Sequence, residues 1–231
     1  MKRILPILTA LVLISSGSFS QVRVSGYTSF SPAFPLGEYK DNNASTAWGG
    51  RLGILVQPNK KTPVKLGIEL GYMTQGFQTQ YFNSINFSQF ADYRVRARLN
   101  IFSGLFNMRL QNGNGKQRVK PFVEGLIGWN NFYGTTKLQQ RNPAEDYEWD
   151  TMDRESTKGY WSLTYGGSAG FDISLDKEKV IWLECKVAYL RGSNTMYYTN
   201  PSVDANGHSK FTLAQSETDM LIPQIGLKFG L

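Results

Sequence analysis

Ionised side chains stand at alternate positions inside segments that are otherwise apolar. Glu69 lies between Ile68 and Leu70, and a comparable spacing recurs further along the chain. Charges of both signs in one alternating phase of neighbouring strands could pair across those strands. We therefore predict a structural charge network. Its candidate members are Glu69, Arg94, Arg96, Arg98, Glu124, Asp172, Glu184, Lys186 and Lys228.

The single histidine is His208, which directly precedes Ser209. Nucleophilic catalysis needs a base within hydrogen-bond reach of the nucleophile and a third group that orients the base. Adjacent residues of a strand point to opposite faces, so this pair could meet only in a turn. The sequence contains no Cys/His metal pattern, phosphate-binding loop, dinucleotide fingerprint or nucleophile elbow. We predict no enzymatic activity, no catalytic residue, no metal site and no cofactor.

The segment 145–155 is acidic and is the one candidate for divalent cations. Asp146, Glu148 and Asp150 would share a face if the chain is extended, and oxygen ligands suit Ca²⁺ or Mg²⁺. The EF-hand pattern fails, because Thr151 stands where that loop requires glycine. We expect a solvated hairpin face here, and cation binding stays an open alternative.

Eight segments with two-residue periodicity must position these side chains. In the clearest of them, Trp161, Leu163 and Tyr165 alternate with polar or small residues, which predicts a strand with one apolar side. In the fourth segment the phase slips around Phe102, which predicts a β-bulge. The segments are 21–30, 46–56, 64–74, 92–110, 118–132, 159–175, 180–191 and 212–231.

The connections between these strands are of two lengths. Three are short and rich in turn-forming residues, namely 57–63, 111–117 and 176–179. Four are long, namely 31–45, 75–91, 133–158 and 192–211. Short turns at one end and long loops at the other are typical of a transmembrane β-barrel, with the short turns in the periplasm and the long loops outside the cell.

Residues 1–20 have the pattern of a secretory signal peptide, with Lys2 and Arg3 before an apolar stretch and small residues before the expected cleavage point. The remaining residues, 21–231, suit one β-domain. The net charge of +7 does not predict nucleic-acid binding, because many basic residues alternate with apolar ones within strands instead of clustering on one surface.

Alternation alone does not decide which face points outward. A soluble lipocalin-like barrel would place the apolar set inside. The polar set here is rich in Gly and Ser, aromatic residues gather near strand ends, and the charges in the polar phase have both signs, which favours apolar side chains facing lipid.

The arginine triplet at positions 94, 96 and 98 tests this sidedness. An arginine that faces lipid at mid-membrane costs about 2–4 kcal/mol, so the three together could cost most of a domain's stability. They must face the barrel interior or lie above the membrane. We predict an Arg–Glu network with Glu69 and Glu124 that fills the lumen, and the alternative is a selectivity element in a conducting pore.

Three stretches carry a family resemblance: Ser-Pro-Ala-Phe-Pro-Leu-Gly-Glu-Tyr at 31–39, Lys-Pro-Phe-Val-Glu-Gly-Leu-Ile-Gly at 120–128 and Ile-Pro-Gln-Ile-Gly-Leu-Lys-Phe-Gly-Leu at 222–231. With them the chain resembles the small outer-membrane β-barrel family, the porin-like eight-stranded domains related to the OmpA and OmpX barrels. The resemblance implies a bacterial outer-membrane location, contact with membrane lipid and lipopolysaccharide, and assembly by the barrel-insertion machinery. Family members usually end in an aromatic residue, whereas this chain ends in Leu231.

The sequence therefore predicts an all-β protein, an eight-stranded antiparallel transmembrane barrel that is monomeric and plugged by its own charges. We predict a structural or surface-interaction role, adhesion or ligand contact, through the long connections 75–91, 133–158 and 192–211. A small porin-like channel is the first alternative. A lipid-modifying barrel enzyme and a secreted lipocalin-like binder are the others.

Overall fold

The computed structural model describes residues 22–59, 62–86, 89–111, 117–141, 148–204 and 206–230. The predicted signal peptide, 1–20, lies outside these residues. Antiparallel strands dominate the described chain, and its one helix is α2 (Gly37–Asn42). No helix in the described segments is long and apolar enough to cross a membrane.

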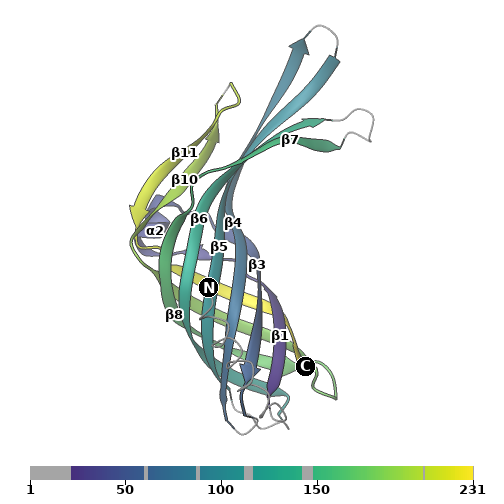
Figure 1. The fold of residues 1–231 in the computed structure, drawn as a ribbon, viewed down its shortest axis with the longest axis vertical. Helices are drawn as coiled ribbons and strands as arrows, with labels where there is room; N and C mark the ends of the chain where they lie inside the picture. The colour runs from purple at the N-terminus through teal and green to yellow at the C-terminus, as the bar shows by residue number, and fades with distance from the viewer. Residues whose placement is uncertain are drawn as a thin grey trace, which may run out of the picture.

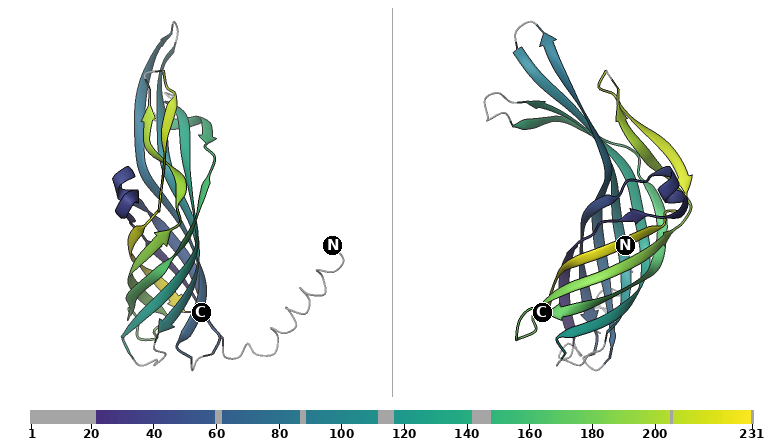
Figure 2. Two further views of the ribbon diagram at one scale, coloured as in Figure 1. Left: turned by 90° about the vertical axis from the view of Figure 1, so that its left-hand side faces the viewer. Right: turned by 180° about the vertical axis from the view of Figure 1, so that it is seen from behind.

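Eight strands close into a barrel, as predicted (Figures 1 and 2). Each pairs antiparallel with its neighbours, and the first strand pairs with the last, from Ser25 opposite Gly230 to Phe30 opposite Ile225, so that the barrel has no open edge. In order round the barrel they are β1 (Arg23–Phe30), β3 (Ala47–Gln57), β4 (Val64–Asn86), β5 (Gln89–Gln111), β6 (Val119–Arg141), β8 (Tyr160–Ser174), β9 (Ile181–Gly192) and β12 (Met220–Gly230).

The segments expected as long connections contain further regular structure. β4 and β5 continue as a hairpin far beyond the barrel. β6 is as long as these two strands, and its far end pairs with the short strand β7 (Trp149–Ser156). β10 (Thr195–Val203) and β11 (Ser209–Ser216) form a second hairpin that stands beside them (Figure 1). β2 (Phe34–Pro35) and α2 occupy the first long connection. The long connections therefore contain regular structure that extends above one end of the barrel, and the described start of β1 and end of β12 lie at the other.

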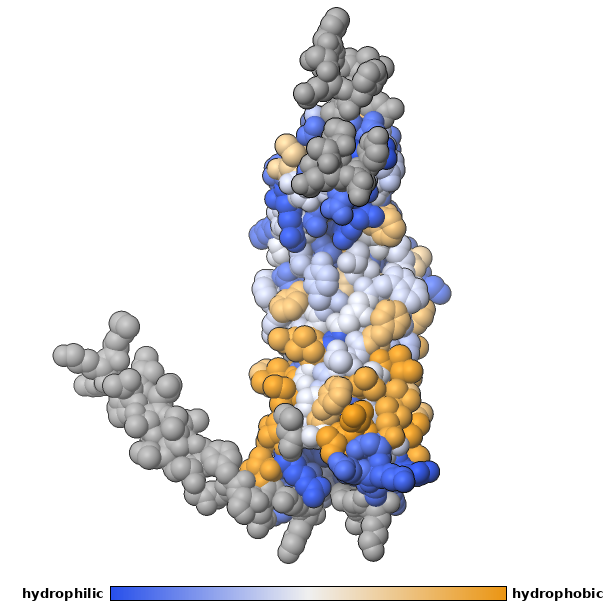
Figure 3. Space-filling model, turned by 90° about the vertical axis from the view of Figure 1, so that its right-hand side faces the viewer, coloured by the Kyte–Doolittle hydropathy of each residue, from blue (hydrophilic) through white to orange (hydrophobic). Residues whose placement is uncertain are grey.

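The outer face of the barrel is apolar, as predicted. Ile68 is 52% exposed and Leu163 is 59% exposed, and hydrophobic residues, in orange, gather as a band on the lower part of the face shown in Figure 3. Aromatic side chains at the upper edge of the band touch one another across strands, with Trp129 contacting both Phe102 and Trp161. A soluble monomer rarely exposes so many large apolar side chains on one continuous surface.

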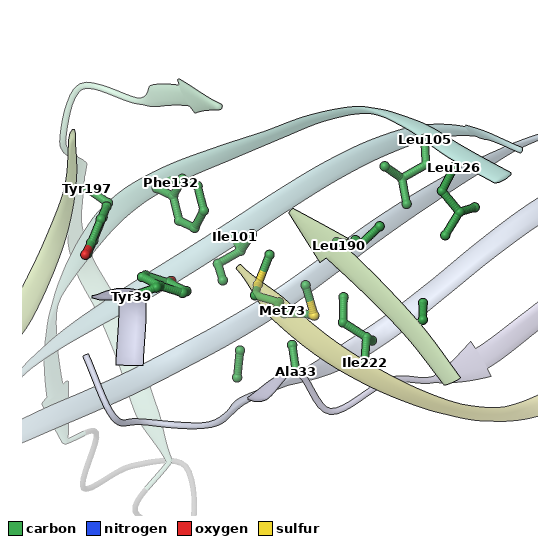
Figure 4. Packing of buried hydrophobic residues seen from close by; sticks show 13 residues of the cluster. Ala33, Tyr39, Met73, Ile101, Leu105, Leu126, Phe132, Leu190, Tyr197 and Ile222 are labelled. Carbon is green, nitrogen blue, oxygen red and sulfur yellow. The ribbon is translucent and has the colours of Figure 1, made fainter. Parts of the chain in front are cut away.

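The barrel interior contains two layers of different chemistry. The layer nearer the short turns is ionic. The layer above it is apolar and is closed at the top by Tyr39 of α2 and Tyr197 of β10, whose rings meet edge to face at 4.8 Å (Figure 4). The labelled members of this apolar layer are Ala33, Tyr39, Met73, Ile101, Leu105, Leu126, Phe132, Leu190, Tyr197 and Ile222.

We call the aromatic side chains at the upper edge of the band the aromatic edge. Above it the outer face of the strands becomes polar, and the inner face is apolar. In β5 the odd-numbered residues keep facing inward, but there Val95 and Ala97 are buried against Val203 of β10, while the arginines at 94, 96 and 98 face outward. The predicted bulge at Phe102 is therefore wrong, because β5 does not change phase. The register shift lies on β4 between Thr74 and Phe77, where Gly76 has a φ of +75°.

Candidate functional site: the ionic layer and the surface platform

The ionic layer is built by side chains from every strand of the barrel. At one side Glu69 of β4 accepts from Arg51 at 2.8 Å, from Lys186 at 2.8 Å and from the Tyr27 hydroxyl at 2.7 Å. All four side chains are almost fully buried. Each oxygen of Glu69 therefore accepts at least one hydrogen bond from a buried donor.

Arg109 of β5 is the centre of the other side. Its Nε donates to Glu124 at 2.6 Å and its Nη1 donates to Glu184 at 2.7 Å, while its guanidinium carbon lies 3.7 Å from the centre of the Phe122 ring. Lys186 joins the two sides, since its Nζ also donates to Glu124 at 3.2 Å. The result is one connected network across the lumen.

Asp172 and Lys228 pair at the lower boundary of this layer. Below them a vestibule of about 440 Å³ opens toward the short-turn end, and Lys65, Lys120 and Trp182 are among the residues that line it. The ion pair therefore forms the inner limit of the vestibule.

The structure brings together Glu69, Glu124, Asp172, Glu184, Lys186 and Lys228 of the predicted network. It does not bring Arg94, Arg96 and Arg98 to them. The arginines that do pair with the buried glutamates are Arg51 and Arg109, which the sequence prediction omitted. The omission of Arg109 follows from the assumed phase slip: with odd residues inward throughout β5, Asn107, Arg109 and Gln111 all face the lumen.

The arginine triplet lies on the upper, outward part of β5, and the prediction that it lines the lumen needs correction. Arg94 donates to Gln139 at 2.9 Å and Arg96 to Thr79 at 3.3 Å, on neighbouring strands outside the barrel. The second option considered from the sequence, a position above the membrane-facing band, is the one that the structure shows.

The upper strands form what we call the surface platform: the parts of β4, β5 and β6 beyond the aromatic edge, with β7 and the β10–β11 hairpin. Its core is formed by Val95, Ala97 and Val203, with Phe82 and Phe211 packed against them. The platform therefore has a hydrophobic core of its own, distinct from the apolar layer inside the barrel.

The remaining candidate residues are spread over the platform. His208 is exposed and its ring lies 3.7 Å from Asp204, whereas the Ser209 hydroxyl contacts Thr136 at 2.6 Å, so the hydroxyl and the ring have different partners. Asp150 lies in β7, and Asp146 is outside the described residues. Within the described ranges, no three acidic, histidine or cysteine side chains gather as a metal site would require.

No protein-family model matches this sequence, and no curated protein does either. Solved structures that it resembles include neisserial surface protein A, at 8% identity and a TM-score of 0.41, with 90% of this chain and 96% of that chain covered. A major outer-membrane protein of Thermus thermophilus is 9% identical, with a TM-score of 0.43, and the match covers 90% of this chain and 99% of that chain. OprG of Pseudomonas aeruginosa is 14% identical, with a TM-score of 0.41, and the match covers 91% of this chain and 94% of that chain. The closed ring of eight antiparallel strands is established by the strand pairing of this chain itself.

Proposed function

We propose that this protein is exported by the signal peptide at 1–20, spans the bacterial outer membrane as a single-chain barrel, and acts at the cell surface through its platform. The closed barrel leaves no strand edge unpaired, and its exposed apolar band requires lipid. A membrane-crossing strand needs about 9–11 residues. β4 and β5 each have 23, so more than half of each strand projects beyond the bilayer.

The observation that carries the surface role is the separate core of the platform. A hairpin that served only to connect two strands would not need to bury Val95 and Ala97 under Val203. A packed platform holds its outer side chains in fixed positions, which suits recognition of a partner. Support for a channel is weaker, because the eight-stranded lumen contains an ionic layer and an apolar layer in series.

Two measurements test this proposal. Cell fractionation with heat-modifiable gel mobility tests the location: the protein is expected in the outer-membrane fraction, and recovery in the aqueous fraction would contradict it.

For the surface role, residues 77–98 are replaced by a two-residue turn, and cells are compared for autoaggregation and for adherence to arrays of glycans and matrix proteins. We expect the trimmed barrel to remain in the membrane and cell contact to fall to the level of the deletion strain. Equal contact by trimmed and wild-type cells would exclude the surface role.

A further inference from the structure

The vestibule below the ionic layer carries an excess of positive charge. Five cations and two carboxylates line it, so its net charge at neutral pH is +3, five minus two. A pocket that is walled by protein and lined mainly by charges of one sign concentrates ions of the opposite sign. The vestibule therefore attracts anions. Its cations are Arg23, Lys65, Lys120, Lys179 and Lys228.

The inner carboxylate of the vestibule, Asp172, is already compensated. One of its oxygens accepts from the Nζ of Lys228 and, at 2.6 Å, from the side-chain amide of Gln111. Its other oxygen lies 3.8 Å from a guanidinium nitrogen of Arg109. The second carboxylate, Glu178, is exposed. Among the described residues, the inner end of the vestibule therefore presents cations, and no uncompensated carboxylate, to an incoming anion.

Lys65 of β4 faces the vestibule with a neutral partner. Its Nζ donates at 2.6 Å to the side-chain carbonyl of Gln111, whose amide nitrogen is turned to Asp172. An ammonium group has three N–H donors, so two of those on Lys65 remain for solvent or a ligand. Gln111 also donates to the backbone carbonyl of Lys120 at 3.3 Å, which brings the two lysines to the same side of the vestibule.

Lys120 of β6 also points at a neutral group. It is directly opposite Asp172 in the register of β6 and β8, yet that carboxylate pairs with Lys228. The Nζ of Lys120 lies instead 4.3 Å from the centre of the Trp182 ring. No carboxylate of the described chain lies within 4 Å of the Nζ of Lys120 or Lys65. Both lysines are half-buried, where a cation without a counter-charge is costly, and an anion between them would remove that cost.

The vestibule has the size of a small-molecule site. Its volume is about 440 Å³, within the roughly 300–1,000 Å³ that is typical of ligand pockets. The Asp172–Lys228 pair closes its inner end, and the apolar layer lies beyond the ionic one. Val24, Val180 and Trp182 add apolar surface to its wall. A ligand that uses the whole lining therefore combines an anionic group with a carbon part.

A phosphate monoester matches the two lysines better than a carboxylate does. At pH 7 a phosphate monoester carries a charge of about −1.5 to −2 and three acceptor oxygens, whereas a carboxylate carries a single charge. Lysine is a common phosphate-binding side chain and acts there as a point charge. One phosphate group therefore balances Lys65 and Lys120 together, and the exposed Arg23 adds to the attraction.

We propose that the vestibule binds a phosphate monoester of a small polar solute, such as a sugar phosphate, through Lys65 and Lys120. The arrival of this solute from the periplasm rests on the proposed outer-membrane placement, whereas binding itself does not.

The test uses the purified protein in phosphatidylcholine nanodiscs, which leave both ends of the barrel open to solution. Isothermal titration calorimetry compares glucose 6-phosphate with inorganic phosphate, glucose and succinate. The variant is K65Q/K120Q. The control is K40Q/K158Q, which makes the same change in net charge at two exposed positions outside the vestibule.

We expect wild type and control to bind glucose 6-phosphate equally and K65Q/K120Q to bind it at least about ten-fold more weakly, because two charged hydrogen-bond donors are lost. Inorganic phosphate and succinate should bind more weakly than glucose 6-phosphate, and glucose should not bind. Equal binding by variant and control overturns the proposal, and so does wild-type protein that fails to bind glucose 6-phosphate. Succinate or inorganic phosphate bound as tightly as the ester also overturns it.

A second measurement uses only the wild-type protein and so does not depend on a variant that folds. Acylation with acetic anhydride, mapped by mass spectrometry, should modify Lys65 and Lys120 less when glucose 6-phosphate is present, and Lys40 and Lys158 to the same extent. Equal modification of Lys65 and Lys120 with and without the ester would place the ligand elsewhere and overturn the proposal. Cell fractionation tests the membrane placement on its own, so a failure of that placement is distinct from a failure of binding.

Discussion

At the residue scale, two arginines of the same strand show what the local sequence leaves undecided. Arg98 and Arg109 both sit in alternating stretches of β5, yet Arg109 is fully buried in the ionic layer and Arg98 is not. Alternation assigns residues to one of two faces but does not say what covers each face. The carboxylates and the two lysines of the network could be placed because apolar neighbours fixed their phase. The arginines of β5 could not, because the predicted change of phase in that strand does not occur.

Arg109 should be the most sensitive cation of the barrel. Replacing it with methionine leaves Glu124 and Glu184 buried without their main partner, which costs about 3–5 kcal/mol of unfolding free energy. The same change at Arg98 should cost less than about 0.5 kcal/mol. Urea unfolding in lipid vesicles, followed by tryptophan fluorescence, measures both.

Removing a carboxylate as well should restore part of the loss. In the double variant R109M/E184Q one uncompensated charge disappears, so its unfolding free energy should exceed that of R109M alone. If the R109M and R98M variants were equally stable, Arg109 would not be the centre of the network.

At the element scale, β4 and β5 differ in how they pass from membrane to platform. β5 continues without a change of phase, whereas β4 contains an extra residue near Gly76 opposite β5. That residue shifts the outward set on β4 from even positions such as Tyr72 to odd positions such as Phe77 and Tyr81. The sequence prediction placed a bulge on β5 and none on β4, because the changed environment along β5 imitates a changed phase.

Deleting Gly76 should therefore disturb the platform and spare the barrel. Without the extra residue, Phe77 and Tyr81 turn toward the inner side and Phe82 turns away from the platform core. Amide hydrogen exchange should show lost protection at 77–98 and normal protection in the lower half of β4. The control is Gly76→Ala, which keeps the register and costs about 1 kcal/mol for its positive φ. Full protection in the deletion variant would contradict the role of the bulge.

At the scale of the whole molecule, the same alternating strands serve three environments in turn. Near the short turns, polar residues face inward and apolar ones face lipid, as at Arg109 and Met108. In the upper barrel the interior becomes apolar, as at Ile101. In the platform the inner face stays apolar and the outer face becomes basic. The strand count and sidedness could be predicted from periodicity, but the apolar layer could not, because its cover comes from α2 and β10, which are distant in sequence.

The two interior layers make a specific prediction about conduction. Wild-type protein in planar bilayers should show no steady single-channel current, because ions must cross both the paired charges and the apolar layer. Opening the ionic layer alone with R109S/E124S should leave the apolar layer closed, and opening the apolar layer alone with L105S/L190S should leave the ionic one closed. Only the variant that carries all four changes should conduct, provided that its heat-modifiable mobility shows a folded barrel. Steady current through the wild-type protein would restore the channel hypothesis and would mean that the layers open in the membrane.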